Sequence, residues 1–266
     1  MEHAGKVPVT RQDLVAGFAG LGIQEGEILF VHSSLRSFGY VEGGARTVVE
    51  ALLELLGGEG TLAVPIFRRF FWEGPDQVWD RDHSPSRMGR ISETVRTWPG
   101  ARRSPHAPHP IAAVGRLAGD LTERYNRSDF APDSPFARLV EQNAWIAMIG
   151  VRYNSCTLIH LIEERLEVPY RYWVELEGTV IENGKAERRK YPFLRRHEGV
   201  YNDFEKLGKK LEEAGKVRST CIGESRILAF RSRDLVALGL REVRRDPLFL
   251  VADACREKAA QYLRSA

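Results

Sequence analysis

The segment between residues 26 and 67 reads as strand, helix and strand, and this order restricts the chain to few architectures. The stretch "GEILFVHSSL" (26–35) is a short apolar run that ends in hydroxyl residues, as a buried strand running into a loop does. Apolar residues at helical spacing follow over 43–58, and "GTLAVPIF" (60–67) is a second buried strand. Strand, helix and strand in this order form a βαβ unit, which predicts a parallel pair within a sheet.

The rest of the chain adds further elements to this unit. Thr10 is placed to cap a helix over 10–22, with Asp13 completing a capping box. The aromatic, turn-rich stretch 68–89 is predicted to be a functional or capping loop. The spacing of apolar residues also predicts helices over 84–98, 134–143, 156–166 and about 201–214, two late helices, and strands over 144–150 and about 217–222.

One stretch departs from the helix–strand alternation. Residues 171–192 alternate and contain Asn183-Gly184, the strongest short hairpin signal. We therefore expect an α/β fold with a mixed central sheet flanked by helices and an antiparallel hairpin excursion around residues 171–192. A chain of 266 residues with 43% hydrophobic content is long enough to form this as a single domain over 1–266.

Charge and composition exclude several classes of protein. The net charge is only +3, the basic residues are scattered, and no known nucleic-acid module occurs, so we expect no nucleic-acid partner. No run of 18 apolar residues and no apolar signal core occur, so we expect no membrane partner and a cytoplasmic location. Three cysteines without a CxxC pattern argue against a disulfide scaffold and a structural zinc site.

Two histidines three residues apart in "RRSPHAPHPIAAVG" (102–115) raise the question of a metal site. His106 and His109 could chelate an ion from one helix face, but the three prolines around them forbid a helix here. No HExxH pattern or His/Asp cluster supports them. We therefore expect no metal, and a stiff loop in which both histidines have another task.

The sequence offers only weak candidates for a nucleophile or a phosphate loop. Ser33 and Ser34 follow a strand, but the glycine-framed elbow of a serine hydrolase is missing. Cys156 lies four residues before His160, so a cysteine–histidine pair is conceivable, although such a cysteine is usually a small buried residue. The stretch "GYVEGG" (39–44) precedes a helix and could hold an anion on backbone N–H groups.

His160 is the most informative single residue. It lies in the apolar helix "CTLIHLIEE", and Glu163 is three residues further on the same face. A carboxylate beside an imidazole fixes its tautomer and raises its basicity, which is what a general base requires. Spacing alone leaves a second interpretation open, in which His160 is a core histidine with a satisfied hydrogen bond.

Several segments, in the same order, resemble the aminoglycoside 3-N-acetyltransferase family, the antibiotic N-acetyltransferases. The resemblance covers about residues 10–235. It is carried by an ordered set of motifs: "VHSSLRSFGYVEGGARTVVEALLELLGGEGTLAVPIF" (31–67), "SPSRMGRISETVR" (84–96), "RSPHAPHPIAAVG" (103–115), "DSPFARLVE" (133–141), "TLIHLIE" (157–163) and "NDFEKLG" (202–208).

The resemblance implies transfer of an acetyl group from acetyl-coenzyme A to a small-molecule amine, with no metal. His160 is then the general base, and Glu163 or Asp203 orients it. The hydroxyl of Thr157, or backbone N–H groups after Leu35, would stabilise the oxyanion. The implied cofactor-binding residues are His32, Ser33, Ser34, Leu35, Arg36, Ser37, Arg87, Met88, Arg103, Ser104, His106 and His109.

Departures from the family pattern concern the pocket more than the base. Ala107 replaces a proline that is usual in the family, Pro110 replaces a serine, and Leu158 replaces the hydroxyl residue beside the histidine. Glu73, Asp76, Asp80 and Asp82 could attract a polycation, but seven arginines crowd the expected rim and favour a neutral or anionic acceptor: Arg68, Arg69, Arg81, Arg188, Arg189, Arg195 and Arg196. An aminoglycoside or amino sugar acceptor and a homodimer both stay open.

Two rival hypotheses remain at the level of sequence. One is a non-catalytic, coenzyme A-binding relative of the family, which the altered loop residues favour and the retained His160–Glu163 pair opposes. The other is an unrelated α/β hydrolase with Cys156 or Ser34 as nucleophile.

Overall fold

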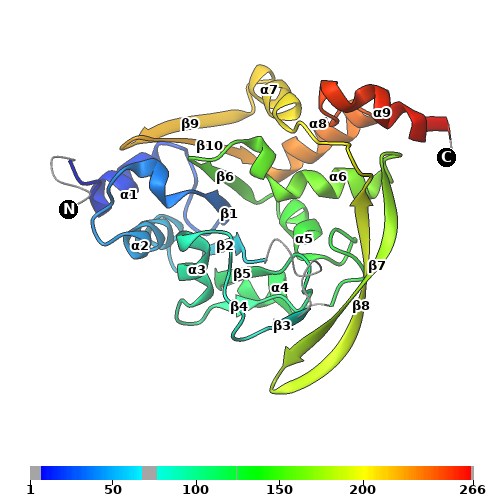
Figure 1. Ribbon diagram of the computed structural model, residues 1–266. Coiled ribbons are helices and arrows are strands. Elements are labelled where there is room, and N and C mark those ends of the chain that lie inside the picture. Colours follow the sequence, from blue (N-terminus) through cyan, green and yellow to red (C-terminus); the bar gives the residue numbers. More distant parts are fainter. Residues whose placement is uncertain (1–6, 68–76, 124, 265–266) are drawn as a thin grey trace.

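The parallel core of the fold is the βαβ unit predicted from the sequence. The computed structural model describes residues 7–67, 77–123 and 125–264. Strand β1 (Ile28–Ser33) pairs in parallel with β2 (Thr61–Pro65) on one side and β6 (Trp145–Ile149) on the other. Helix α2 (Ala45–Leu56) connects β1 to β2. These strands form the centre of a seven-stranded sheet with the order β4-β5-β2-β1-β6-β10-β9 (Figure 1).

The outer strands of this sheet run antiparallel to their neighbours, so the sheet is mixed, as predicted. The predicted strand near 217–222 is present as β9 (Val217–Ile222). Three outer strands were not predicted from the sequence. They are β4 (Arg102–Arg103), β5 (Ile111–Gly115) and β10 (Ser225–Arg231). Since β4 and β5 pair with each other, the stiff loop expected over 103–115 is shorter and spans only 104–110.

Alternating residues of the central strands contribute to two separate apolar cores. On β1, Ile28 and Phe30 pack into one core, and Leu29 and Val31 pack into the other. Helices α5, α6 and α8 lie over the first face of the sheet, and α1, α2 and α3 lie over the second (Figure 1). Burial on both faces explains why the strands read as continuous apolar runs rather than as alternating ones.

The predicted helices occur in the predicted order, and the short helix Ala118–Thr122 was not predicted. The capping box of α1 is present: Asp13 N–H donates to Thr10 Oγ1 at 3.2 Å, and Thr10 N–H donates to Asp13 Oδ2 at 2.9 Å. The α-helices are α1 (Arg11–Ala19), α2, α3 (Arg90–Arg96), α4 (Ala118–Thr122), α5 (Pro135–Glu141), α6 (His160–Arg165), α7 (Glu205–Glu213), α8 (Ser232–Arg245) and α9 (Arg256–Ala260). The 3₁₀ turns are η1 (Leu35–Phe38), η2 (Tyr153–Ser155), η3 (Thr157–Ile159), η4 (Asp253–Cys255) and η5 (Gln261–Arg264).

The helix predicted over 84–98 is shorter than expected. It begins only at Arg90, because Gly89 has φ = 102°, a left-handed value that an α-helix does not accept. The predicted start at Ser84 was wrong, since Ser84 Oγ accepts the N–H of Asp80 at 2.9 Å and closes a turn instead. Met88 therefore lies on an irregular segment before α3.

The hairpin excursion is confirmed and is longer than predicted. Strands β7 (Arg171–Glu182) and β8 (Lys185–Arg196) pair antiparallel around Asn183 and Gly184, whose φ values of 52° and 74° fit a tight two-residue turn. Strand β3 (Val78–Asp80) joins β7 in parallel to form a second, three-stranded sheet. Figure 1 shows the hairpin running along one side of the molecule, with β3 against it and α6 near its upper end. Within the described residues, no helix is long and apolar enough to span a membrane.

Candidate active site

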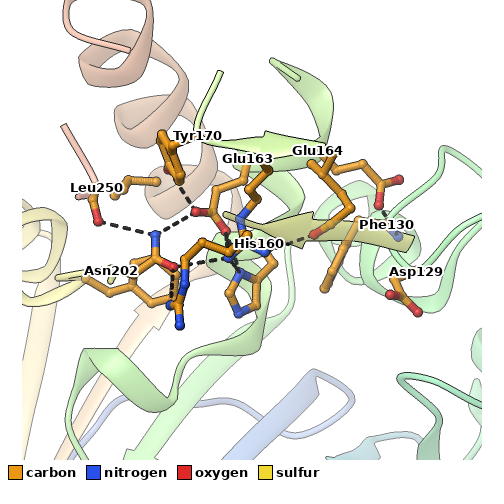
Figure 2. Close-up of polar contacts among 12 residues, drawn as sticks. Asp129, Phe130, His160, Glu163, Glu164, Tyr170, Asn202 and Leu250 are labelled. Carbon is orange, nitrogen blue, oxygen red and sulfur yellow. Dashed lines mark hydrogen bonds and ion pairs between the residues drawn. The ribbon is translucent and has the colours of Figure 1, made fainter. Parts of the chain in front are cut away.

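A histidine and a glutamate meet on the first turn of α6. His160 Nδ1 lies 2.5 Å from Glu163 Oε2, which is the contact expected from their spacing of three residues (Figure 2). The apolar neighbours Leu161 and Ile162 are fully buried and fix the helix against the core. The helix thus keeps Glu163 buried while the side chain of His160 stays partly exposed.

Glu163 is held from three other directions. Tyr170 OH and Asn202 Nδ2 both donate to Glu163 Oε1, at 2.8 Å and 2.7 Å, and Arg171 Nη2 lies 2.9 Å from Glu163 Oε2 (Figure 2). Burial would raise the pKa of this carboxyl, but Arg171 and His160 outweigh burial and lower the pKa to about 2. Glu163 is therefore a fixed negative charge at any physiological pH.

The same surroundings define the state of His160. Its side chain is 29% exposed and packs against the rings of Phe130, at 5.9 Å, and Phe204, at 5.1 Å. Burial lowers the pKa of His160, while Glu163 opposes that shift. A neutral imidazole whose Nδ1–H donates to Glu163 carries its lone pair on Nε2. This nitrogen is the one available for chemistry.

Two cavities meet at His160. The larger cavity measures about 850 Å³ and the smaller about 490 Å³, and His160, His109 and Phe67 line both of them. The larger cavity is also lined by Asp129, Phe130, Glu163, Glu164, Arg171 and residues 193–201, and the smaller one by His32, Ser33, Pro65, Met88, Val151 and residues 154–157.

Part of the cofactor-binding set predicted from the sequence lines the smaller cavity. These residues come from three separate segments: His32 and Ser33 at the end of β1, Met88 before α3, and His109 in the loop after β4. The predicted catalytic Thr157 lines the same cavity. His32 Nε2 and Ser33 Oγ are buried without a hydrogen-bond partner among the described residues, so the smaller cavity offers two polar atoms to a ligand.

Five further predicted residues do not line the smaller cavity, but they are close in sequence to residues that do. Ser34, Leu35, Arg36 and Ser37 continue from β1 into η1, and Arg87 precedes Met88. Ser37 Oγ donates to Ser34 O at 2.7 Å, and lies 2.8 Å from Ser225 Oγ. Arg36 and Arg87 are exposed and remain available for a charged group outside the cavity.

The other three predicted cofactor-binding residues are turned into the protein. Arg103 is buried and donates from Nη2 to Ser84 O at 2.7 Å. Ser104 Oγ accepts the N–H of Ile111 at 2.9 Å. Both side chains therefore bind backbone groups of nearby segments. His106 is also buried and lies against Tyr191, with 4.9 Å between the ring centroids. All three side chains are buried and line neither cavity, so their contact with a cofactor stays a prediction.

The predicted acid partner Asp203 is not beside His160. Its Oδ1 accepts the N–H of Glu205 at 3.2 Å, at the start of α7. The neighbouring residue, Asn202, supplies the contact with Glu163 instead. Sequence reasoning chose the right segment, "NDFEKLG", but its carboxylate rather than its amide. Tyr170 and Arg171 were missed because they carry no local signal beyond the start of the hairpin.

The cysteine considered as a nucleophile does not suit that role. Cys156 lines the smaller cavity but is almost fully buried, and burial raises the pKa of its thiol to about 12. A thiol with this pKa is not ionised near neutral pH, and the thiolate is the reactive form.

The charged residues that line the larger cavity differ from those expected for the acidic patch and the arginine-rich rim. Asp80 accepts backbone N–H groups of Asp82 and His83, and Arg188 and Arg189 pair with carboxylates of the hairpin. Glu73, Asp76, Arg68 and Arg69 lie outside the described residues. The charged residues that do line the larger cavity are Asp129, Glu163, Glu164, Glu198, Arg171, Arg195 and Arg196.

Fold and site together define an α/β protein with a histidine–carboxylate pair at the junction of two cavities. The family model described as aminoglycoside 3-N-acetyltransferase matches residues 30–243. The chain belongs to this family. It is an N-acetyltransferase, and acetyl-coenzyme A is the acetyl donor of the family reaction, as predicted from the sequence.

Individual relatives agree with this assignment. The chain is 31% identical to aminoglycoside N(3)-acetyltransferase IV of Salmonella sp, over 91% of this chain and 90% of the relative. It is 28% identical to aminoglycoside N(3)-acetyltransferase IX of Micromonospora chalcea, over 84% and 89%. Its structure matches a histidine-to-alanine mutant of aminoglycoside acetyltransferase AAC(3)-IVa in complex with a gentamicin, with a TM-score of 0.81, 29% identity and 93% coverage of each chain.

Proposed function

We propose that this enzyme transfers the acetyl group of acetyl-coenzyme A to an amino group of an aminoglycoside or related amino sugar, with His160 as general base. One observation carries the proposal: His160 lines both cavities, so a single imidazole reaches a donor in one and an acceptor in the other. The smaller cavity is the donor site and the larger one the acceptor site.

The donor site suits a thioester for two reasons. His32 Nε2 and Ser33 Oγ are buried polar atoms without a partner among the described residues, and a bound carbonyl or amide would satisfy them. The Thr157 hydroxyl lines the same cavity and is a candidate donor to the oxyanion that forms at the thioester carbonyl. The exposed Arg36 and Arg87 are placed outside it, where phosphate groups of the cofactor would meet them.

The base acts through Nε2. An alkylammonium group is not a nucleophile until it loses a proton, and a positioned base contributes about 10²–10⁴-fold in rate. Glu163 accepts the Nδ1–H of His160, holds the ring in the productive tautomer and stabilises the imidazolium that forms. Tyr170, Arg171 and Asn202 fix that carboxylate in turn.

The acceptor site offers both signs of charge to an amino sugar. Burial raises the pKa of Glu164 to about 7, so this carboxyl is partly ionised at neutral pH and can gain charge when an ammonium group binds. Arg195 and Arg196 line the same cavity. An acceptor would match these charges if it carried an amino group for Glu164 and a hydroxyl or acidic group for the two arginines.

The proposal is tested by the release of coenzyme A thiol from acetyl-coenzyme A. The expected result is thiol release that depends on an added aminoglycoside or amino sugar, with the N-acetylated product found by mass spectrometry. Hydrolysis of acetyl-coenzyme A at the same rate without any amine would contradict it. His83→Ala is a suitable control variant, since this histidine is 84% exposed and lines neither cavity.

A further inference from the structure

A second histidine at the junction is also held by a carboxylate. His109 Nδ1 lies 2.9 Å from Asp129 Oδ2, and the two side chains are only 12% and 3% exposed. A carboxylate thus lies at ion-pair distance from Nδ1, and Nε2 is on the opposite side of the same ring. Figure 2 shows Asp129 beside Phe130, on the side of His160 away from Asn202.

The ring of His109 is fixed by aromatic side chains. It lies parallel to Phe193 with 6.1 Å between the centroids, and packs against Phe67 at 4.8 Å and Phe130 at 5.5 Å. Phe130 also contacts His160, so both imidazoles lie against the same ring. Prolines on both sides of His109 fix φ in the loop and restrict its backbone.

Asp129 also touches a third histidine. Its Oδ1 lies 3.1 Å from His106 Nε2, but burial lowers the pKa of His106 to about 4 despite the carboxylate. His106 thus stays neutral near pH 7 and does not neutralise Asp129. The titratable groups that interact with His109 are Asp129, His106, His160 and Glu164.

The overall reaction requires two protons to move. A bound ammonium loses two protons in becoming an amide, the leaving sulfur gains one, and one is released to solvent. His160 can take the first proton before attack. A second group is then needed to give a proton to sulfur as the carbon–sulfur bond breaks.

We propose that His109, positioned by Asp129, is a second catalytic residue that protonates the leaving thiolate. This inference depends on the proposed function. His160 takes the first ammonium proton, the amine nitrogen bonds to the carbonyl carbon, and the carbon–sulfur bond breaks as His109 Nε2 gives its proton to sulfur. His109 then takes the second proton from the acetylated nitrogen, and His160 releases its proton to solvent, so both residues return to their initial states.

The test compares His109→Gln, Asp129→Asn and the control His83→Gln in the wild-type background. With both substrates saturating, a general acid at this position should give kcat an alkaline fall, because an acid acts only while it carries its proton. His109→Gln should lower kcat about 10²-fold and remove this alkaline fall. Asp129→Asn should lower kcat, because the amide carries no charge to hold the ring, and His83→Gln should change neither kcat nor its pH profile. Circular dichroism shows whether each variant is folded.

Two results would overturn the inference. One is a His109→Gln enzyme whose kcat is within about threefold of wild type. The other is a lower kcat with an unchanged pH profile, which would indicate a structural role only. Failure of the proposed function itself would look different, since the wild type would then release no thiol in response to an amine.

A second readout is independent of turnover. In the free protein, ¹⁵N NMR of the labelled imidazoles should show His109 with its proton on Nδ1, facing Asp129. Asp129→Asn should weaken this preference. A wild-type His109 whose neutral form carries its proton on Nε2 would contradict the assigned role of Asp129, and would do so even in a variant that has lost activity.

Discussion

Arg171 Nη2 lies 2.9 Å from Glu163 Oε2, and the two side chains are 10% and 1% exposed. This buried ion pair links the first residue of the hairpin to the carboxylate that holds the proposed base. Arg171 also donates to Leu194 O on β8 at 3.0 Å. The hairpin, which the sequence predicted as an excursion, is therefore part of the wall of the larger cavity.

Glu163→Gln should impair both catalysis and stability. The amide cannot stabilise the His160 imidazolium, so kcat should fall about 10²-fold or more. Arg171 would also lose its buried counter-charge, and breaking such a pair typically costs about 3–5 kcal/mol of unfolding free energy. Urea unfolding and steady-state kinetics measure the two effects. The control Glu213→Gln removes only an exposed carboxylate on α7 and should stay within about 0.5 kcal/mol.

Two buried histidines predict a loss of stability in mild acid. Burial lowers the pKa of His32 to about 3, and burial lowers the pKa of His106 to about 4, from 6.5. The unfolded chain then binds protons below pH 6.5 that the folded chain does not, so stability falls as the pH falls from 6.5 toward these values. Each histidine should remove about 2 kcal/mol of unfolding free energy by pH 5.

Urea unfolding of the wild type and His106→Gln at pH 7.5 and pH 5 checks this. The variant should lose about 2 kcal/mol less than the wild type between the two pH values. If both proteins lost the same unfolding free energy between the two pH values, His106 would not be the cause of the acid sensitivity.

Thr157→Val tests the proposed oxyanion donor. The side chain is buried in the wall of the smaller cavity, and valine keeps its volume while removing the hydroxyl. Loss of one such donor typically lowers kcat about 10²–10³-fold. Thr157→Ser retains the hydroxyl and should recover most of the rate. If the valine variant turns over as fast as wild type, the donor lies elsewhere, for example on the backbone N–H groups after Leu35.

Glu164 predicts a pH-dependent affinity for cationic acceptors. Burial raises the pKa of this carboxyl to about 7, so its negative charge increases as the pH rises from 6 to 8. The KM for a polycationic aminoglycoside should therefore fall over this range, and Glu164→Gln should remove the dependence and raise KM about tenfold at pH 8. The KM for acetyl-coenzyme A serves as an internal control. If Glu164→Gln kept the pH-dependent KM, Glu164 would not be the group that causes this dependence.

The sequence predicted those parts of the fold that depend on local pattern. The unit over 26–67 is strongly apolar in its strands and amphipathic in its helix, and it formed as expected. Strands β4 and β5 were missed because one has two residues and the other directly follows Pro110, which reads as loop. Their pairing is a long-range contact that periodicity does not reveal.

The contacts within the candidate site could be predicted where the residues are close in sequence. His160 and Glu163 are one helical turn apart, so their contact follows from spacing. Asn202 comes from a segment about 40 residues away, where a carboxylate, Asp203, was the more plausible chemical choice. Asp129 lies in a loop without a motif, and only the folded chain brings it between His106 and His109.

The most direct measurement compares His160→Gln with the wild type in two assays, calorimetric binding of acetyl-coenzyme A and aminoglycoside-dependent thiol release. Because His160 is proposed to move a proton rather than to bind the cofactor, the dissociation constant for acetyl-coenzyme A should change less than about threefold while kcat falls about 10²–10⁴-fold. A variant that binds acetyl-coenzyme A normally and keeps wild-type kcat would show that His160 is not the general base.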